Sequence, residues 1–201
     1  MKFPSFKPQL DNYSEEILKD CLSKKAISGN FGEYIKKVED EYSNLHRNYY
    51  SVTCSSGTSA LHLACLSLGV QKKHTVVVPA TTNMATFFAP MYIGAKVLSC
   101  EVDPKDGLID LGYLRKICEN EKVDFVIIVH LYGHIVNTTK LRELEEEFKF
   151  RVIEDCAEAH FGKDEKNNFV GSNFDAGCFS FYANKIISGG EGGIVLFKNQ
   201  K

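Results

Sequence analysis

One lysine stands where it could act as a nucleophile. Lys185 follows the apolar run Ala176 to Tyr182 and precedes a glycine-rich stretch at residues 189–193. A lysine amine held in a largely apolar pocket loses its hydration and becomes reactive towards carbonyl groups. A lysine can equally lie along the surface with its charged end in water. Taken alone, Lys185 is more typical of the surface position.

A hydroxyl-rich turn, Ser55-Ser56-Gly57-Thr58, lies between a strand-like and a helix-like segment. The N–H groups at the start of a helix can bind a phosphate, and Gly57 would let the ligand approach the backbone closely. Ser56 or Thr58 could instead simply cap the helix. The sequence contains neither a G-x-x-x-x-G-K-[ST] loop nor a G-x-G-x-x-G after its early strands, so the usual nucleotide-binding loops are not expected.

Asp155 ends another apolar segment, Val152-Ile153-Glu154-Asp155. Ligands of parallel sheets bind at the carboxyl ends of the strands, where a carboxylate can hold a cation or a protonated ring nitrogen. A helix N-cap is the alternative role for Asp155. Taken together, the phosphate turn, Asp155 and Lys185 are the parts that pyridoxal 5'-phosphate (PLP) needs: a phosphate anchor, a partner for its pyridine nitrogen, and an amine for its aldehyde.

The histidines do not form a metal-binding pattern. His130 and His134 have H-x-x-x-H spacing, but they lie at and just after the end of a predicted strand and are not on a predicted helix, so with His160, Asp155 and Glu158 they do not form a convincing set of metal ligands. Each isolated histidine is more typical of a hydrogen-bonded structural residue. No metal site is therefore expected.

The elements that would hold these residues alternate between strand and helix. Residues 1–48 are expected to form an N-terminal helical segment, broken near 28–30, and residues 49–201 the ligand-binding large domain. Strands that are apolar throughout are typical of a parallel sheet covered on both faces. The expected fold is therefore α/β, a three-layer sandwich with a mainly parallel sheet. Strands are expected at 50–54, 75–79, 96–102, 125–130, 151–154, 176–182 and 193–197, and helices at 59–68, 84–92, 111–119 and 139–148.

The composition argues against several classes of protein. The 201 residues include 24 lysines and arginines and 26 aspartates and glutamates, a net charge of −2. A broad nucleic-acid surface would need a basic excess. No apolar run approaches the length of a membrane-spanning helix, and the N-terminus does not have the pattern of a signal peptide. The seven cysteines are spread out with no C-x-x-C pair, so we expect reduced thiols in a cytoplasmic protein.

A series of short motifs runs along nearly the whole chain. In order they are Ser28 to Gly32, Val38-Glu39, Cys54 to His62, Val77 to Pro79, Gly94 to Val97, Val102 to Pro104, Glu154 to His160, Val170 to Ser172, Cys178 to Lys185 and Gly190 to Gly193. Together they resemble the DegT-like family of fold-type I, PLP-dependent sugar aminotransferases. The stretches 158–160 and 183–187 look most like the perosamine-synthase branch, which aminates a 4-keto nucleotide sugar.

The resemblance implies roles for individual residues. Lys185 would form the Schiff base with PLP and move the proton during the reaction. Asp155 would pair with the pyridine nitrogen, and Glu158 would lie near the 3-hydroxyl group of the cofactor. His160 would lie near the active site. The residues that would bind the phosphate are Gly57, Thr58 and Ser180.

The resemblance also implies a reaction and its partners. An amino acid, glutamate, would donate the amino group, and a keto nucleotide sugar would accept it for polysaccharide biosynthesis. The sites of fold-type I enzymes form at a dimer interface, so a homodimer is expected, without nucleic acid or membrane partners. Family members are nearly twice as long, so the C-terminal small domain is expected to be absent or supplied by a separate chain.

One residue departs from the family pattern. Relatives often place an aromatic side chain against the cofactor ring where this sequence has Asn83, which predicts that stacking is lost or comes from elsewhere. The alternatives to an active aminotransferase are a truncated, inactive PLP-fold remnant or binding protein and a PLP-dependent sugar dehydratase. Related dehydratases often have histidine at the lysine position, so Lys185 argues against the dehydratase. The expected length deficit leaves open whether this chain alone is an enzyme.

Overall fold

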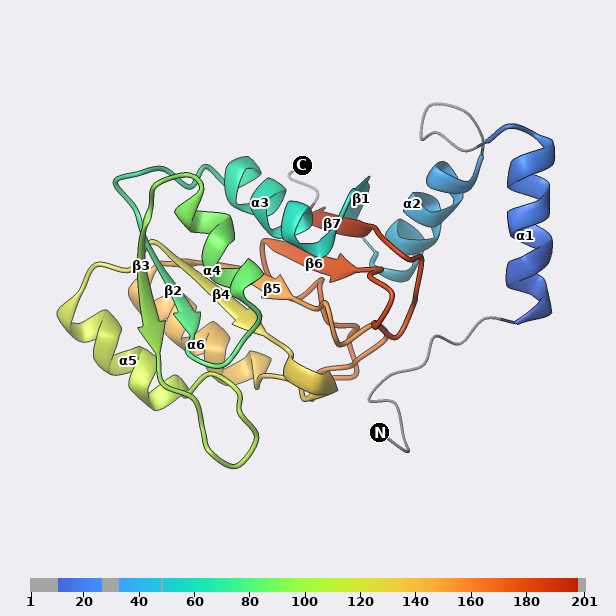
Figure 1. Cartoon of the computed structure of the whole chain (residues 1–201). Helices are drawn as coiled ribbons and strands as arrows, with labels where there is room; N and C mark the ends of the chain where they lie inside the picture. Colours follow the sequence, from blue (N-terminus) through green and yellow to red (C-terminus); the bar gives the residue numbers. More distant parts are fainter. Residues whose placement is uncertain (1–10, 27–32, 48, 199–201) are drawn as a thin grey trace, which may run out of the picture.

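The computed structural model describes residues 11–26, 33–47 and 49–198, and a seven-stranded β-sheet forms its centre (Figure 1). The strands lie side by side in the order β1-β7-β6-β5-β4-β2-β3. Their bounds are β1 Tyr49–Cys54, β2 Thr75–Pro79, β3 Lys96–Cys100, β4 Phe125–Val129, β5 Arg151–Asp155, β6 Ala176–Ser180 and β7 Gly193–Lys198. The helices are α1 Asn12–Ser23, α2 Tyr34–Leu45, α3 Gly57–Ser67, α4 Met84–Met91, α5 Leu111–Asn120 and α6 Thr138–Phe148, with a short 3₁₀ helix, η1 Leu131–Gly133.

The sheet is mainly parallel, as the apolar strands predicted. β2 pairs in parallel with β3 and β4, β4 with β5, and β5 with β6. β7 alone of these strands is reversed and runs antiparallel to both β1 and β6. Because neighbouring parallel strands end at the same edge, the carboxyl ends of β4, β5 and β6 lie next to one another, where ligands of such sheets bind.

Helices cover the sheet on both faces: α3 and α4 on one, α5 and α6 on the other (Figure 1). The three valines of β2 illustrate the reason. Val76 and Val78 pack into the core beneath α3 and α4, while Val77 packs into the core beneath α5 and α6. Successive side chains of a strand point to opposite faces, and all three are fully buried. The predicted three-layer sandwich is confirmed.

Helix α2 packs against β1 and β7, at one edge of the sheet. Tyr42 of α2 packs with Ile194 and Leu196 of β7, and its ring meets that of Phe179 edge-on at 5.4 Å between centroids. α1 has no buried residue and stands away from the sheet (Figure 1). The helix break expected near 28–30 lies outside the described residues, and the division of the chain at residue 48 stays a prediction.

The cysteines are reduced in the structure, and most of them lie in the interior. All seven cysteines are free thiols, and four of them are buried: Cys65, Cys100, Cys156 and Cys178. Burial raises the pKa of the Cys65 thiol to about 12, so this group is held in its unreactive protonated form. Within the described part of the chain, no helix has both the length and the apolar character needed to cross a membrane.

Candidate active site

A pocket of about 330 Å³ lies at the carboxyl edge of the sheet, between the ends of β5 and β6, the start of α3 and the loop that follows β6. The predicted site residues that line it are Gly57, Thr58, Asp155, Ser180 and Lys185. Glu158, the remaining predicted residue, contacts Lys185 by its side chain. The structure thus brings together six residues that lie up to 128 positions apart in the sequence (185 − 57 = 128).

One wall of the pocket is the first turn of α3. Ser56 caps this helix: its hydroxyl accepts the Ser59 N–H at 3.1 Å, and its carbonyl accepts the Ala60 N–H at 3.0 Å. The N–H groups of Gly57 and Thr58 come before these bonds and point out of the helix end, together with its partial positive charge. The capping and phosphate-binding interpretations of this turn are therefore compatible.

The α3 turn packs directly on the end of β6. A side chain at Gly57 would place its Cβ 2.8 Å from Cβ of Ser180, closer than two carbon atoms can approach. Gly193 is equally constrained, because a Cβ there would lie 2.4 Å from the carbonyl oxygen of Ser56. These two glycines let the Ser180 hydroxyl and the α3 N–H groups line the same pocket.

Asp155 ends β5 with its side chain only 4% exposed. Its Oδ1 accepts the Ala157 N–H at 3.1 Å, and its Oδ2 accepts the Thr86 hydroxyl at 2.9 Å. The residues that follow form turns, so Asp155 does not cap a helix. Burial raises the pKa of this carboxyl group, and the two hydrogen bonds and the nearby Lys185 oppose that rise by favouring the ionised form.

Lys185 lies in the turn after β6, and its side chain is only 14% exposed. Its ammonium group is 2.9 Å from Oε1 of Glu158, whose Oε2 accepts the Tyr132 N–H at 3.1 Å. Tyr132 adopts a positive φ of 51°, a conformation that a tyrosine rarely takes. The environment of Lys185 is therefore that of a partly buried, oriented amine and not that of a freely solvated surface lysine.

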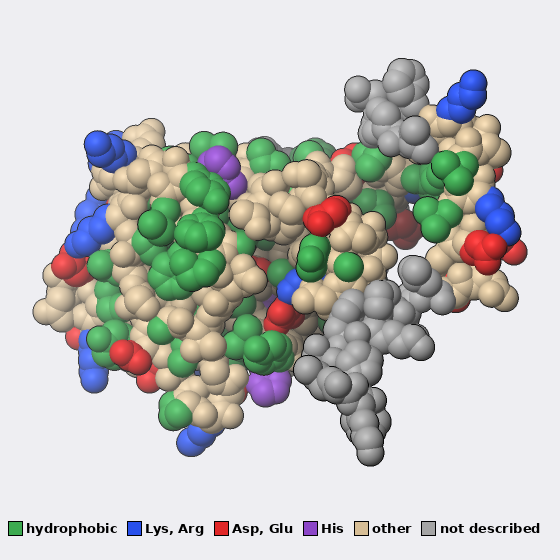
Figure 2. Space-filling model, viewed as in Figure 1, with side chains coloured by type: hydrophobic (Ala, Val, Ile, Leu, Met, Phe, Trp, Pro, Cys, Tyr) green, Lys and Arg blue, Asp and Glu red, His purple; other side chains and the backbone are tan. Residues whose placement is uncertain are grey.

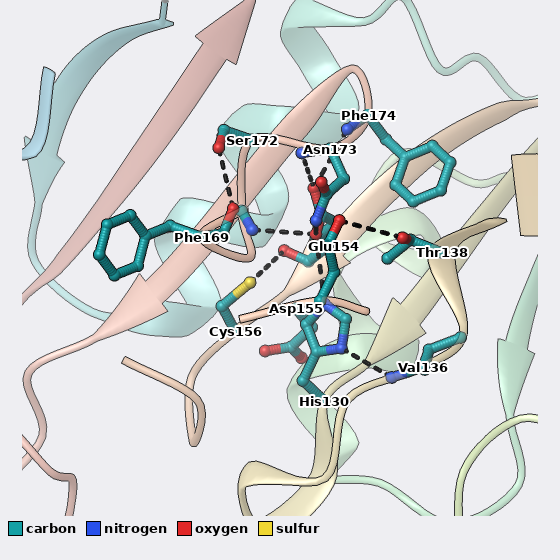
Figure 3. A network of polar contacts seen from close by, with 12 residues as sticks. His130, Val136, Thr138, Glu154, Asp155, Cys156, Phe169, Ser172, Asn173 and Phe174 are labelled. Carbon is teal, nitrogen blue, oxygen red and sulfur yellow. Dashed lines mark hydrogen bonds and ion pairs between the residues drawn. The ribbon is translucent and has the colours of Figure 1, made fainter. Parts of the chain in front are cut away.

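Beside Asp155, the carboxylate of Glu154 is the centre of a buried polar network (Figure 3). Oε1 accepts the N–H groups of Asn173 at 2.7 Å and Phe174 at 3.1 Å. Oε2 accepts the Gly171 N–H at 2.9 Å and lies 3.2 Å from Nε2 of His130, and the Asn173 side-chain amide adds a contact at 3.3 Å. Five donors offset the cost of burying one charge, and they hold the loop before β6 against β5.

His130, Glu154 and Cys156 are near enough to one another to resemble a set of metal ligands. However, Nδ1 of His130 accepts the Val136 N–H at 3.2 Å, so the ring proton lies on Nε2 and is donated to Glu154. The Cys156 thiol points at the Glu154 carbonyl oxygen at 3.8 Å, and burial raises its pKa well above the usual value. Ligands must give up such protons to bind a metal, so this cluster is better explained as a structural network.

His160 lies behind the pocket and connects α2 to the end of β6. Its Nε2 is 2.8 Å from the Ser180 carbonyl oxygen and therefore carries the proton, while Nδ1 accepts the Tyr42 hydroxyl at 2.7 Å. Burial lowers the pKa of His160, which favours this neutral ring. His160 thus supports the backbone of a predicted site residue, whereas His134 is exposed.

The segment between β2 and α4 contributes more than the sequence predicted. Asn83 lines the pocket and also caps α4, because its side-chain oxygen accepts the Ala85 N–H at 3.0 Å. Thr86, which contacts Asp155, was not among the predicted residues. The sequence gives one weak indication of its importance, because Thr86 is the only polar residue in the apolar helix sequence Met-Ala-Thr-Phe-Phe-Ala-Pro-Met. In the structure Thr86 is fully buried.

Comparison with known proteins places this geometry in a family. GDP-perosamine synthase of Escherichia coli O157:H7 is 37% identical over 197 residues, which are 98% of this chain and 53% of that protein. The structure of an aminotransferase from Psychrobacter cryohalolentis matches with a TM-score of 0.89 and 28% identity, over 96% of this chain and 49% of that one. A candidate sugar aminotransferase from Streptococcus pneumoniae, solved in its PLP form, matches with a TM-score of 0.85 and 25% identity, over 98% and 53% of the two chains.

The matches agree on the fold and on the extent of the similarity. The chain spans about half the length of the curated relatives it matches, and its fold is that of the large domain of fold-type I aminotransferases. The model of the DegT/DnrJ/EryC1/StrS aminotransferase family matches residues 8–201. The chain therefore belongs to the DegT/DnrJ/EryC1/StrS aminotransferase family.

Proposed function

We propose that the pocket binds PLP and that the chain provides the cofactor-binding part of an enzyme that transfers an amino group from an amino acid, glutamate, to a keto nucleotide sugar. One observation carries the proposal: Lys185, Asp155 and the first turn of α3 face a single pocket. A lysine amine, a buried carboxylate and an anion-binding turn correspond to the aldehyde, the ring nitrogen and the phosphate of one molecule.

The α3 end of the pocket fits a phosphate group. The N–H groups of Gly57 and Thr58 supply donors at the positive end of a helix of 11 residues. The Ser180 hydroxyl lies beside them, since its Oγ would be 3.2 Å from a Cβ at position 57. A methyl group at Gly57 would overlap the Ser180 side chain, so glycine is needed for both to line this end of the pocket. We assign phosphate binding to these three residues.

The opposite wall fits a cationic ring nitrogen. The Asp155 carboxylate accepts one hydrogen bond at each oxygen, so each oxygen keeps a lone pair for a further donor. Burial alone raises the pKa of Asp155, and a cation beside it would lower that pKa again by stabilising the charged form. We assign to Asp155 the role of keeping the ring nitrogen protonated.

Lys185 is placed to act on carbonyl carbon and on protons. We assign to its Nζ the role of the amine that would hold the PLP aldehyde and that would move a proton to and from the substrate carbon. PLP supplies the electron sink for this chemistry when it is bound. Glu158 holds Nζ at 2.9 Å, and we place its carboxylate near the 3-hydroxyl group of the cofactor, where the Lys185 and Tyr132 contacts offset negative charge.

The substrates are proposed from the relatives. The similarity to GDP-perosamine synthase supports a nucleotide sugar as the amino acceptor. Because the chain spans about half of such relatives, we propose that the sugar and the amino acid bind where further residues, from a longer polypeptide or a separate chain, meet this pocket. A cytoplasmic location in polysaccharide biosynthesis is consistent with nucleotide-sugar chemistry and with seven free thiols.

A surface beside the pocket supports self-association as a homodimer. Apolar side chains gather over α3 and α4 in Figure 2, on the segment that also contributes Asn83 to the pocket. Apolar patches of this kind mark protein interaction sites on soluble proteins. We name this surface the α3–α4 patch, and its exposed members are Leu63, Leu66, Met84, Phe88, Met91 and Tyr92.

The cofactor proposal is tested by adding PLP to the purified chain and recording the visible absorbance of lysine-bound PLP. We expect the wild type to develop this absorbance and Lys185→Ala to lose it. Lys122→Ala is the matched control, because that side chain is 87% exposed, pairs with Asp124 and does not line the pocket. A well-folded wild type without the absorbance, or Lys185→Ala with it, would refute the proposal.

A further inference from the structure

A chain of two hydroxyl groups reaches the Asp155 carboxylate from α4. Oγ1 of Thr86 lies 2.9 Å from Oδ2 of Asp155, and Oγ1 of Thr82 lies 2.8 Å from Oγ1 of Thr86. Thr86 is fully buried, and Thr82, just before α4, is half-buried. The two threonines belong to a different layer of the fold from Asp155, which ends a central strand.

The direction of these hydrogen bonds is fixed by the chemistry of the groups. An ionised carboxylate can only accept, so Thr86 must donate its one hydroxyl proton to Asp155. Thr82 must then be the donor to Thr86. The order is therefore Thr82 to Thr86 to Asp155, and each donor increases the polarity of the next bond.

This arrangement determines how the carboxylate is oriented. With Oδ1 held by the Ala157 N–H and Oδ2 held by Thr86, rotation of the Asp155 side chain would break at least one bond in a site that is only 4% exposed. Leaving a buried donor or acceptor without a partner is unfavourable, so the observed orientation is the preferred one. Thr86 belongs to α4, and Asn83 and Ala85 at the start of this helix line the pocket. The contact between Thr86 and Asp155 therefore also fixes the start of α4 relative to the end of β5.

We propose that Thr86, supported by Thr82, is a positioning residue that holds the Asp155 carboxylate ionised and turned towards the ring nitrogen of the cofactor. This inference rests on the proposed function, because it assigns Thr86 a purpose at the PLP site. It goes beyond it in naming residues that touch neither the substrate nor the cofactor.

The test compares PLP dissociation constants, measured by absorbance titration of the full chain, among hydroxyl variants. Thr86→Val keeps the shape but removes the donor, and we expect it to weaken PLP binding about tenfold, whereas Thr86→Ser should stay within about threefold of the wild type. Thr138→Val is the matched control: Thr138 is also a buried threonine whose hydroxyl proton is directed at carboxylates, those of Glu165 at 3.1 Å and Asp164 at 3.2 Å, outside the pocket. It should bind PLP as the wild type does.

A second readout requires no cofactor. Carbon-13 NMR of the Asp155 carboxyl group in the PLP-free chain should show a higher pKa in Thr86→Val than in the wild type or Thr138→Val, because the ionised form has lost a donor. If the wild type binds PLP tightly and Thr86→Val leaves both the affinity within twofold and this pKa unchanged, the inference is wrong and the proposed function stands. If Thr86→Ser is as defective as Thr86→Val, the role is packing and the inference is also wrong. Failure of the wild type to bind PLP refutes the proposed function itself.

Discussion

Replacing Glu154 by glutamine is the most informative test of how the fold supports its site. The substitution keeps the size of the side chain and replaces one oxygen by an NH₂ group that can only donate. Five donors converge on the Glu154 carboxylate in the buried network of Figure 3. A glutamine therefore presents its NH₂ group to donors in either orientation of the amide.

The expected loss of stability follows from counting these donors. If the amide oxygen takes the place of Oε1, it keeps the bonds to Asn173 and Phe174 but the NH₂ group faces His130 and the Gly171 N–H. If it takes the place of Oε2, the N–H groups of Asn173 and Phe174 lose their acceptor. At least two buried donors are left without partners, at about 1–3 kcal/mol each, which gives about 2–6 kcal/mol. A domain of this size is stable by only about 5–15 kcal/mol.

The assay is urea unfolding of the chain, followed by circular dichroism, with the free energy of unfolding obtained by linear extrapolation. Glu158→Gln is the matched control, because the same chemical change at this 30%-exposed carboxylate removes one ion pair, worth at most about 1 kcal/mol. A Glu154→Gln variant within 1 kcal/mol of the wild type would show that the network does not hold the loop before β6 as argued.

Two further predictions concern acid stability and assembly. Burial lowers the pKa of His46 from 6.5 to about 4, so on acidification His46 is protonated in the unfolded chain before it is protonated in the folded one. The contribution of neutral His46 to the free energy of unfolding is therefore complete above pH 6.5 and is lost as the pH falls towards 4. Between pH 6.5 and 5 the loss from His46 is about 2 kcal/mol, and urea titrations at both pH values should find a smaller loss in His46→Gln; an equal loss would contradict this. Sedimentation of the PLP-loaded chain should reveal a dimer that Met91→Asp, within the α3–α4 patch, converts to a monomer, and a monomeric wild type would exclude the proposed interface.

The arrangement of the elements could be predicted because the apolar pattern is strong. Strand β2 was predicted with its observed bounds, since five buried residues end at a proline. Strand β6 was predicted to reach Tyr182 but ends at Ser180, which pairs with Gly193, the first residue of β7. Beyond this point Phe181 bonds to the glycine-rich loop, because its N–H donates to the Gly192 carbonyl and its carbonyl accepts the Gly189 N–H. The end of an apolar segment can be read from the residue types. The end of the backbone pairing between two strands depends on where the partner strand ends, which the residue types do not show.

The sequence singled out pocket residues whose types have a chemistry of their own, and it did not single out residues whose importance comes from their contacts. Lys185 and Asp155 follow or end apolar segments, and it was their combination with the turn at residues 55–58 that indicated a PLP site. Thr86 lies 69 positions from its partner Asp155, and nothing near it in the sequence predicts that contact. Glu154 was visible as a charge in an apolar strand, but its five donors come from two loops whose paths only the folded chain defines.

The pair Glu154 and Asp155 explains how one strand can serve both structure and ligand binding. Neighbouring side chains of a strand point to opposite faces, so Glu154 meets the loop before β6, while Asp155 meets α4 and the pocket. An ionised carboxylate has about four lone-pair positions. Five donors saturate Glu154, whereas the two donors at Asp155 leave about half of its capacity unused. A saturated buried carboxylate has nothing left to offer a ligand, so the unfilled capacity of Asp155, at the edge where ligands of parallel sheets bind, is what distinguishes the proposed binding residue from the structural one.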